Sequence, residues 1–235
     1  KAYGVAEIEA LGCPKVLFVP NAFDPETHYP RELSAEEKRE RGGPVGFIGG
    51  FEPDRARSIL ALADAGIPVR VYGEGWSHLR DKHPRLRVEG KAVFDDDYAK
   101  TICSFDINLG FLRKLNRDKQ TTRSVEIPAC GAFMLAERTE EHLHLFREGV
   151  EAEFFADDDE LFSKVRHYLE HPEKRRRVAA AGRQRCVTSK YSYDDIVAHI
   201  LDVAMYRNRD GSHRQCSSST VLPPPGRERR DSTVE

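Results

Sequence analysis

The chain has 235 residues, of which 39% are hydrophobic and 32% are charged, so a packed core can form beneath a heavily charged surface. The 37 lysines and arginines nearly balance the 39 aspartates and glutamates, which argues against a nucleic-acid or anionic-membrane partner. No apolar run approaches the ~20 residues that span a bilayer, and no signal peptide is visible. The five cysteines are an odd number without CxxC spacing. We therefore expect no metal site, no disulfide framework and a cytoplasmic location.

Residues 1–42 show no pattern of a complete domain. A helix that ends near Gly12 is followed by a predicted strand at 15–19, KVLFV. Three prolines within 20–30 predict an extended connector. Ser34 and Glu37 have the spacing of a capping box, which predicts a short surface helix. The sequence does not begin with methionine, as is typical of a fragment.

Apolar strand and helix patterns alternate from about residue 43 to 206, with glycines at the ends of strands. This alternation predicts an α/β domain with a parallel sheet flanked by helices. The tail 207–235 is rich in Ser, Pro and Arg and is predicted to be disordered. We expect strands at 45–48, 68–72, 84–88, 107–109, 133–136 and 152–155, and helices at 55–65, 95–104, 122–129, 159–169, 172–190 and 193–206.

A glycine pair, Gly49 and Gly50, follows the first strand of this domain. Such a strand-to-helix turn lets a phosphate approach backbone amides at a helix N-terminus, and Arg55 in the first helical turn can add a charge-assisted contact. The turn is neither GxGxxG nor a P-loop, which argues against a dinucleotide site or an NTP hydrolase. An ordinary βα turn is an equally compatible interpretation.

The polar loop after the strand at 107–109 carries the strongest site signal. Asp118 and Glu126 flank Arg123, and Thr121 precedes the predicted helix. Carboxylates suit the vicinal diols of a ribose or sugar ring, and an arginine fork suits a diphosphate. A salt-bridged surface loop has the same composition, but its position after a buried strand favours a ligand site, with a nucleotide-sugar as the expected ligand.

The remaining polar and aromatic features have a structural interpretation. The single tryptophan, Trp76, is expected to plug a turn rather than to flank a base. The basic run 171–177 alternates with other residues and is expected to be a solvated helix face. The histidines of the predicted helical regions have no metal-ligand spacing and are expected to be solvated: His142, His144, His167, His171 and His199.

The run NRDKQTTRSVEIPACGAFML, at 116–135, resembles the signature of CgeB-type, spore-maturation-like glycosyltransferases. These enzymes form a branch of the retaining GT-B group, whose C-terminal domain is Rossmann-like and binds a nucleotide-sugar. The similarity extends over residues 1–205 and includes VPNAFDPETHYP, FIGGFEPDR, VYGEGW, EEHLHLFREGVEAEFF, DELF, YLEHP, AAAGR and YSY.

The resemblance implies roles for individual residues. In the family's Glu-x7-Glu motif the second glutamate binds the ribose hydroxyls, and Glu126 occupies that place. The first glutamate contacts the transferred sugar, and here Asp118 replaces it. The donor phosphates would meet Gly49, Gly50 and Arg55, with Arg123 as a further candidate. Gly90 and the three residues that follow it would lie at the base.

The resemblance also implies a domain organisation. Residues 1–42 would be a remnant of an N-terminal domain with the interdomain hinge, and residues 43–206 the donor-binding domain. The nucleotide-sugar would be the substrate, with no cofactor and no divalent metal, and the acceptor, of unknown nature, would bind the other domain. The chain alone would then be inactive. Two alternatives remain open: a non-catalytic spore-coat or surface-assembly protein with this fold, and a sugar-nucleotide epimerase of similar architecture.

Overall fold

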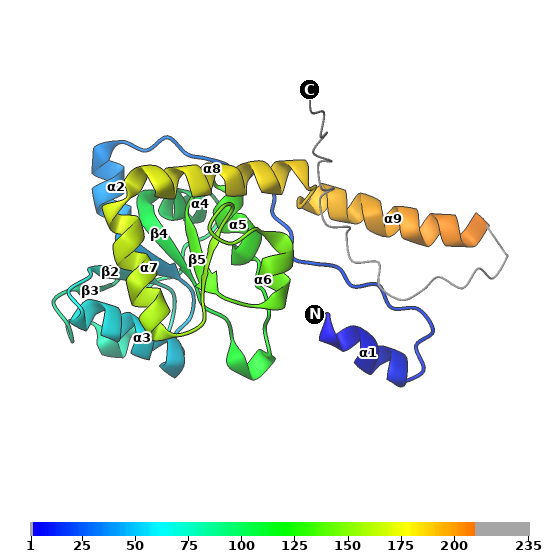
Figure 1. Cartoon of the computed structure of the whole chain (residues 1–235), viewed down its shortest axis with the longest axis horizontal. Coiled ribbons are helices and arrows are strands. Elements are labelled where there is room, and N and C mark those ends of the chain that lie inside the picture. Colours follow the sequence, from blue (N-terminus) through cyan, green and yellow to red (C-terminus); the bar gives the residue numbers. More distant parts are fainter. Residues whose placement is uncertain (1, 210–235) are drawn as a thin grey trace, which may run out of the picture. The chain divides into compact units, whose positions relative to one another are not determined.

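The computed structural model describes residues 2–209 (Figure 1). Residues 21–198 form one compact unit, and the described residues outside this range belong to a second unit. Residues 21–42 thus belong to the same unit as the sheet. The tail predicted from residue 207 lies, from residue 210 onwards, outside the described residues. Between residues 2 and 209 no helix is both long and apolar enough to cross a membrane.

The larger unit contains a six-stranded, fully parallel sheet in the order β3-β2-β1-β4-β5-β6. The predicted α/β class with a Rossmann-like parallel sheet is therefore confirmed. The strand predicted at 15–19 is wrong, because this apolar run has no neighbouring strand to pair with. The strands are β1 (Gly43–Ile48), β2 (Val69–Tyr72), β3 (Leu86–Val88), β4 (Phe105–Gly110), β5 (Met134–Glu137) and β6 (Glu153–Phe155).

The helices start and stop close to the predicted positions because their ends carry local signals. Pro53 opens the first helix after β1, where its missing N–H costs nothing, and Gly66 follows that helix with a φ of 89°. The capping box at Ser34 and Glu37 is present. The helices are α1 (Tyr3–Ala10), α2 (Ala35–Arg41), α3 (Pro53–Asp64), α4 (Asp95–Ser104), α5 (Arg123–Ala129), α6 (Glu140–Leu145), α7 (Asp158–Glu170), α8 (Pro172–Thr188) and α9 (Tyr193–Arg209), with 3-10 turns η1 (Ser77–Leu79) and η2 (Lys114–Asn116).

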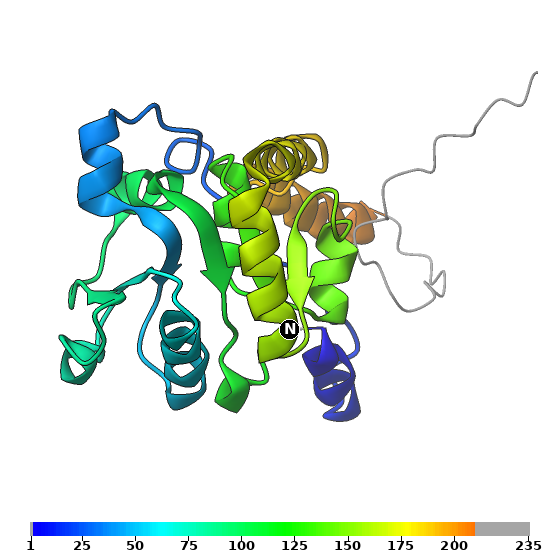
Figure 2. The same ribbon diagram turned by 60° about the vertical axis from the view of Figure 1, so that its left-hand side comes forward.

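Two apolar layers cover the two faces of the sheet, since successive strand residues point to opposite sides. On β5, Leu135 faces the layer built with α3 and α7, whereas Met134 and Ala136 face the layer built with α4, α5 and α6. Helix α7 crosses in front of the strands in Figure 1, and Figure 2 gives a turned view of the same layers. Both layers are continuous, so the carboxyl edge of the sheet is held rigidly.

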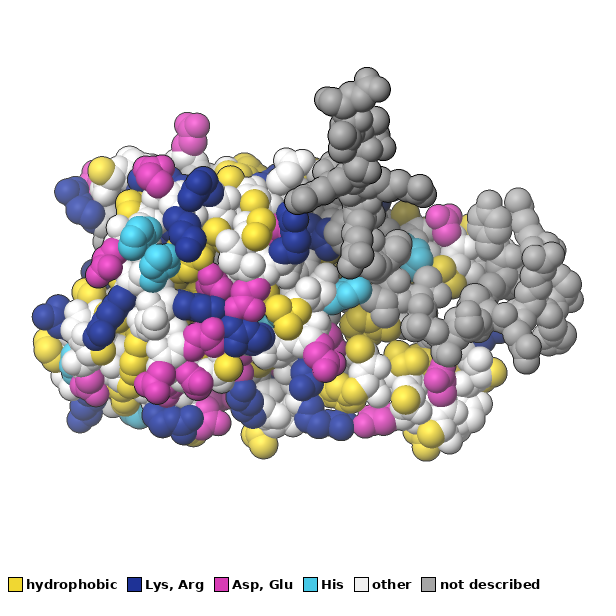
Figure 3. Space-filling model, viewed as in Figure 1, with side chains coloured by type: hydrophobic (Ala, Val, Ile, Leu, Met, Phe, Trp, Pro, Cys, Tyr) yellow, Lys and Arg dark blue, Asp and Glu magenta, His cyan; other side chains and the backbone are white. Residues whose placement is uncertain are grey.

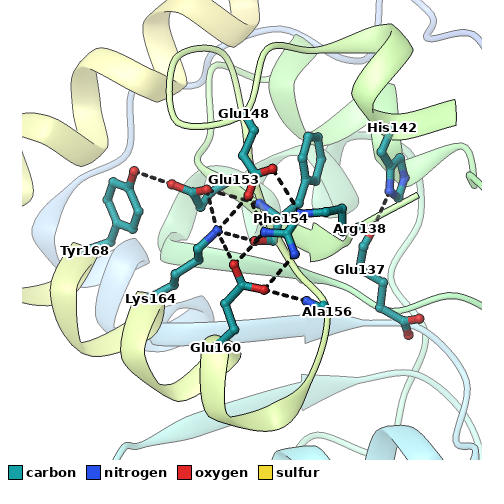
Figure 4. A network of polar contacts seen from close by, with 10 residues as sticks. All are labelled: Glu137, Arg138, His142, Glu148, Glu153, Phe154, Ala156, Glu160, Lys164 and Tyr168. Carbon is teal, nitrogen blue, oxygen red and sulfur yellow. Dashed lines mark hydrogen bonds and ion pairs between the residues drawn. The ribbon is translucent and has the colours of Figure 1, made fainter. Parts of the chain in front are cut away.

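A network of ion pairs fastens the edge strand β6 to α7 (Figure 4). Arg138, directly after β5, contacts both Glu148 and Glu160. Lys164 of α7 contacts the same two carboxylates and also Glu153 of β6. The Arg138 hydrogen bonds lower the pKa of Glu148 to about 2 and place that of Glu160 well below its usual range. The network therefore stabilises the fold only while both carboxylates are charged.

Replacing Arg138 is expected to destabilise the protein and to make its free energy of unfolding depend less on pH in the acid range. The pKa of Glu148 is lower in the folded than in the unfolded chain, so its contribution is complete above about pH 4.5 and is lost as the pH falls towards 2. Urea denaturation at pH 7 should show Arg138→Met losing about 2 kcal/mol. Between pH 6 and 3 the variant should lose less stability than the wild type, and parallel profiles would contradict this assignment.

Candidate functional site

The strand order reverses between β1 and β4, and at such a switch point the loops that leave the carboxyl ends of the strands separate and form a crevice. A cleft of about 540 Å³ lies there. It collects residues from the loops after β1, β2 and β3, from the N-terminal ends of α4 and α5, and from the connector before α2. They are His28, Ile48, Gly49, Gly50, Gly73, Glu74, Ala92, Val93, Phe94, Asp95, Tyr98, Thr122, Arg123 and Glu126.

Two glycine turns form the floor of this cleft. Gly73 has a φ of 132°, and a Cβ at this position would lie 2.2 Å from the carbonyl oxygen of Gly49, so only glycine fits. The buried Trp76 donates from Nε1 to the same carbonyl, at 2.8 Å. Trp76 thus supports the turn from within the core, as predicted. A side chain at Gly50 would meet open space, whereas one at Gly49 would clash with the ring of Phe47.

Glu126 is the buried carboxylate of the cleft, at 9% exposed, whereas Glu74 and Asp95 of the lining are exposed. The Tyr98 hydroxyl of α4 donates to its Oε2 at 2.6 Å, and His28 Nε2 lies 3.9 Å from its Oε1. The backbone N–H of Asp24 donates to His28 Nδ1 at 3.1 Å, so a neutral His28 carries its proton on the nitrogen that faces Glu126. Burial and the Glu126 charge raise the pKa of Tyr98 well above its usual value, so Tyr98 remains a donor. The carboxylate is oriented yet retains acceptor capacity for a ligand.

The arginines of the site occupy two different positions. Arg123 lines the cleft, and its Nε is buried without a hydrogen-bond partner among the described residues. The Nε of Arg55 is likewise buried without a hydrogen-bond partner among the described residues, but Arg55 lies outside the cleft lining, and its Nη1 donates to the carbonyl oxygen of Gly50 at 3.0 Å. Burial lowers the pKa of Arg55, and Arg123 and Arg113 lower it further, while Glu52 opposes them. Arg55 supports the glycine turn from behind, whereas Arg123 presents its charge to the cleft.

Four predicted site residues, Gly49, Gly50, Arg123 and Glu126, thus line one cleft, and the others lie around it. Asp118 is half-buried, and its backbone N–H donates to the carbonyl oxygen of Arg113. The backbone N–H of Thr121 donates to Ser124 Oγ, and the carbonyl oxygen of Thr121 accepts from the backbone N–H of Ser124. Gly90 has a φ of 67° and packs against Arg80, but Ala92 to Asp95 after it do line the cleft. The proposed ligand contacts of all these residues remain predictions.

Several cleft residues were absent from the sequence-based interpretation of the site, among them His28, Tyr98 and Phe94. Phe94 is 71% exposed at the cleft, and Tyr98 follows one turn later on α4. The spacing Phe-x3-Tyr after a predicted strand could have indicated that Phe94 and Tyr98 belong to the site. His28 lay in a segment interpreted only as a connector, so nothing local indicated that it approaches Glu126.

The prediction that His142 is solvated is wrong. His142 is fully buried, its Nε2 lies 2.7 Å from Ser124 Oγ, and its Nδ1 donates to the carbonyl oxygen of Glu137 at 2.6 Å. Ser124 Oγ accepts from the backbone N–H of Thr121, so its hydroxyl proton points to the imidazole. Burial lowers the pKa of His142, which keeps the ring neutral. His142 therefore fixes the start of α5, the helix that carries Arg123 and Glu126.

Replacing His142 by alanine is expected to lower the free energy of unfolding by about 2–3 kcal/mol, because a cavity forms and the carbonyl of Glu137 loses its donor. Urea denaturation measures this loss. His199→Ala is the matched control, since His199 is only half-buried and should change the stability by less than about 1 kcal/mol. Equal losses in the two variants would contradict the structural role of His142.

The distribution of charge supports a confined site rather than an extended electrostatic surface. Among the described residues on the face shown in Figure 3, lysine and arginine side chains alternate with aspartate and glutamate side chains. No group of three or more His, Cys, Asp or Glu side chains that could hold a metal ion occurs between residues 2 and 209.

Known structures share this fold. HepE (Alr3699) from Anabaena, in complex with UDP and glucose, has 15% identity and a TM-score of 0.63 over 80% of this chain and 56% of its own. Sucrose-phosphate synthase from Thermosynechococcus elongatus has 15% identity and a TM-score of 0.62 over 84% and 53%. The C-terminal domain of the glycosyl transferase group 1 protein LpcC from Francisella tularensis has 14% identity and a TM-score of 0.57 over 73% and 99%.

The chain therefore spans about half the length of HepE and of sucrose-phosphate synthase, but nearly all of the LpcC C-terminal domain. At these identities the likeness shows the fold, which is the Rossmann-like domain of GT-B glycosyltransferases. No curated protein sequence matches the chain. A family model described as "Glycosyl transferase-like" matches residues 55–202. Because this match covers more than half of the chain, the protein belongs to the glycosyl transferase-like family.

Proposed function

We propose that this chain is the donor-binding half of a GT-B glycosyltransferase of the CgeB-type branch. The observation that carries the proposal is the pairing of Arg123 and Glu126, one helical turn apart on α5, in a single cleft with the Gly49–Gly50 turn. A cation, an oriented carboxylate and open glycine backbone match the three chemical parts of a nucleoside diphosphate.

Each part of the donor has a proposed partner. Glu126 accepts hydrogen bonds from the ribose hydroxyls while Tyr98 holds its other oxygen. The guanidinium group of Arg123 and the amides of the Gly49–Gly50 turn take the diphosphate, and Ala92 to Asp95 border the base. Asp118 is proposed to contact the transferred sugar. As the glycosidic bond breaks, negative charge grows on the diphosphate, and fixed donors stabilise that charge without reorganising.

The acceptor side of the reaction is proposed to lie outside this chain. HepE and sucrose-phosphate synthase are nearly twice as long as the part that matches, so a second domain facing the cleft would supply the acceptor site. Residues 1–42 are proposed to lead from that domain, and the chain alone is proposed to bind donor without turnover. The retaining stereochemistry, the family's role in spore maturation and a cytoplasmic location are parts of the same proposal.

Calorimetric titration tests the donor site directly. HepE has been solved with UDP and with UDP-glucose, so UDP is the first nucleotide to titrate, followed by ADP, GDP, TDP and their sugars. Saturable binding of one nucleotide diphosphate, tighter than its nucleoside, supports the proposal. If no nucleotide binds, a non-catalytic protein with this fold explains the chain better. Conversion of the bound sugar, followed by NMR, would favour an epimerase.

Donor binding is expected to be independent of divalent metal, because Arg123 supplies the positive charge that a metal supplies elsewhere. The Kd for the nucleotide diphosphate should agree within about twofold in EDTA and in magnesium chloride. A much weaker Kd in EDTA would show that the diphosphate reaches this site as a metal complex.

A further inference from the structure

A second pocket, of about 330 Å³, lies at the opposite edge of the sheet, at the amino ends of β4 and β5. It shares no lining residue with the nucleotide cleft. Two of its residues are cysteines, Cys103 in the last turn of α4 and Cys130 at the end of α5. The remaining lining is Pro30, Arg31, Lys38, Phe105, Asp106, Gly131, Ala132, Phe133, Arg175, Arg176 and Ala179.

The two cysteines are placed for reaction with each other. Both residues line the same pocket, and a hydrogen bond joins the Cys103 side chain to the backbone of Cys130, although they are 27 residues apart in the chain. The backbone N–H of Arg31 donates to Cys103 Sγ at 3.4 Å. In the thiol form Cys103 donates to the carbonyl oxygen of Cys130 at 3.4 Å, a contact that the thiolate gives up. Cys103 is half-buried at the pocket, whereas Cys130 is buried behind it.

The charges around Cys103 favour its thiolate. The hydrogen bond from Cys130 lowers the pKa of Cys103 most, burial opposes it, and the Arg31 amide and the charges of Arg31 and Lys38 lower the pKa further. The same pairing raises the pKa of Cys130 far above its usual value, so Cys130 stays a thiol beside the more acidic Cys103. The facing groups of β4 and α8 are Asp106, which is bound by Arg175, and Arg176, which is paired with Glu173. Arg31 is itself paired with Asp96.

We propose that Cys103 and Cys130 form a redox-modification site, in which a peroxide oxidises Cys103 and Cys130 closes a disulfide. The Cys103 thiolate attacks one peroxide oxygen, the O–O bond breaks, and a sulfenic acid forms while hydroxide leaves. The Cys130 sulfur then attacks the sulfenic sulfur, and the S–O bond breaks. The hydroxide that leaves takes the Cys130 proton and becomes water. Overall the dithiol loses two hydrogens, and hydrogen peroxide is reduced to two molecules of water.

The other described cysteines lack this arrangement. Cys186 is fully buried, burial raises its pKa, and its Sγ faces only the carbonyl oxygen of Val125 at 3.7 Å. Cys13 is exposed and contacts the carbonyl oxygen of Lys15. The pair also joins α4 and α5, the helices that carry Tyr98 and Glu126, at the ends away from the cleft. The site does not depend on nucleotide binding.

Peptide mapping of the full chain tests the proposal. The protein is treated with stoichiometric hydrogen peroxide at pH 7, alkylated and digested with trypsin, which separates Cys103 in peptide 101–113 from Cys130 in peptide 124–138. We expect these two peptides to be joined by a disulfide that dithiothreitol reverses, before Cys13 or Cys186 is modified. Cys103 that stays a thiol, or that bonds to another cysteine first, overturns the proposal.

Two variants separate the steps. In Cys130→Ala, dimedone should trap Cys103 as a sulfenic acid, since no resolving thiol is left. The pH at which Cys103 is half-maximally alkylated by iodoacetamide should lie below that of an ordinary thiol in the wild type and should rise in this variant. An unchanged alkylation profile would show that Cys130 does not activate Cys103. Cys186→Ala is the matched control and should still form the disulfide.

Discussion

Glu126→Gln is expected to weaken the binding of UDP about 100-fold while leaving the fold intact. Glutamine keeps the shape of the side chain and an oxygen that accepts from Tyr98, while its NH2 group then faces His28 Nε2 across about the 3.9 Å that separate Nε2 from Oε1 of Glu126. It loses the negative charge and one acceptor atom that the ribose hydroxyls require. Replacing two charge-assisted hydrogen bonds by weaker ones costs about 3 kcal/mol of binding free energy, which raises the Kd by about two orders of magnitude. Calorimetry with the wild type and the variant measures the ratio.

The matched control for this experiment is Glu74→Gln. Glu74 lines the same cleft but is exposed to solvent. The same chemical change at this position should alter the Kd for UDP by less than about threefold. Tyr98→Phe should fall between the two, because it frees one Glu126 oxygen without removing the charge. Losses of equal size in Glu74→Gln and Glu126→Gln would show that general negative charge, rather than the oriented carboxylate, governs binding.

The sequence predicted the sheet well because each strand and each turn has a local signal. A short stretch of sequence is enough to indicate the strands at 45–48 and 107–109, because each is an apolar run with glycine after it. Parallel pairing follows from the alternation of strands with helices. The strand predicted at 15–19 has an equally apolar pattern, but strand formation needs a partner, and the partner is a property of the tertiary structure. Apolar patterning alone could not distinguish the two cases.

The candidate site was predicted only where its residues follow strands. Gly49, Gly50, Arg123 and Glu126 line the cleft because strand ends and helix starts converge at a switch point. His142 shows the opposite case. Its neighbours in sequence are polar, but three distant groups, Ser124, Glu137 and Phe154, enclose it. Burial of this kind depends on how α6 packs on the sheet, which periodicity over six residues does not determine.

The sequence also does not determine the direction of a side chain. This direction distinguishes Arg55 from Arg123, which the sequence analysis assigned together to the donor phosphates. Arg55 and Arg123 both approach the ring of Phe47, at 5.6 Å and 5.9 Å from its centroid. The Nε of each arginine is buried without a hydrogen-bond partner among the described residues. The two differ because Arg55 donates from Nη1 to the carbonyl oxygen of Gly50, whereas Arg123 lines the cleft. Because a carbonyl oxygen and a phosphate would compete for Arg55, we expect Arg123 to carry most of the recognition of the diphosphate.

Arg123→Met is therefore expected to raise the Kd for UDP about 10- to 100-fold and to leave the Kd for uridine unchanged. A charge-assisted hydrogen bond contributes about 1.5–3 kcal/mol, and uridine has no phosphate with which to form it. Methionine keeps most of the apolar contact with Phe47, so folding should be preserved. Calorimetry with both ligands gives the two ratios. Equal weakening of UDP and uridine would show that the variant distorts the cleft.

Arg55→Met is the matched variant, since it removes the same charge from the same cluster. It leaves the carbonyl of Gly50 without its donor, so we expect a loss of about 1 kcal/mol in the free energy of unfolding. The Kd for UDP should rise less than in Arg123→Met, by less than about fivefold. If Arg55→Met instead weakens UDP more and spares uridine, the phosphate lies behind the glycine turn, and the roles of the two arginines are reversed.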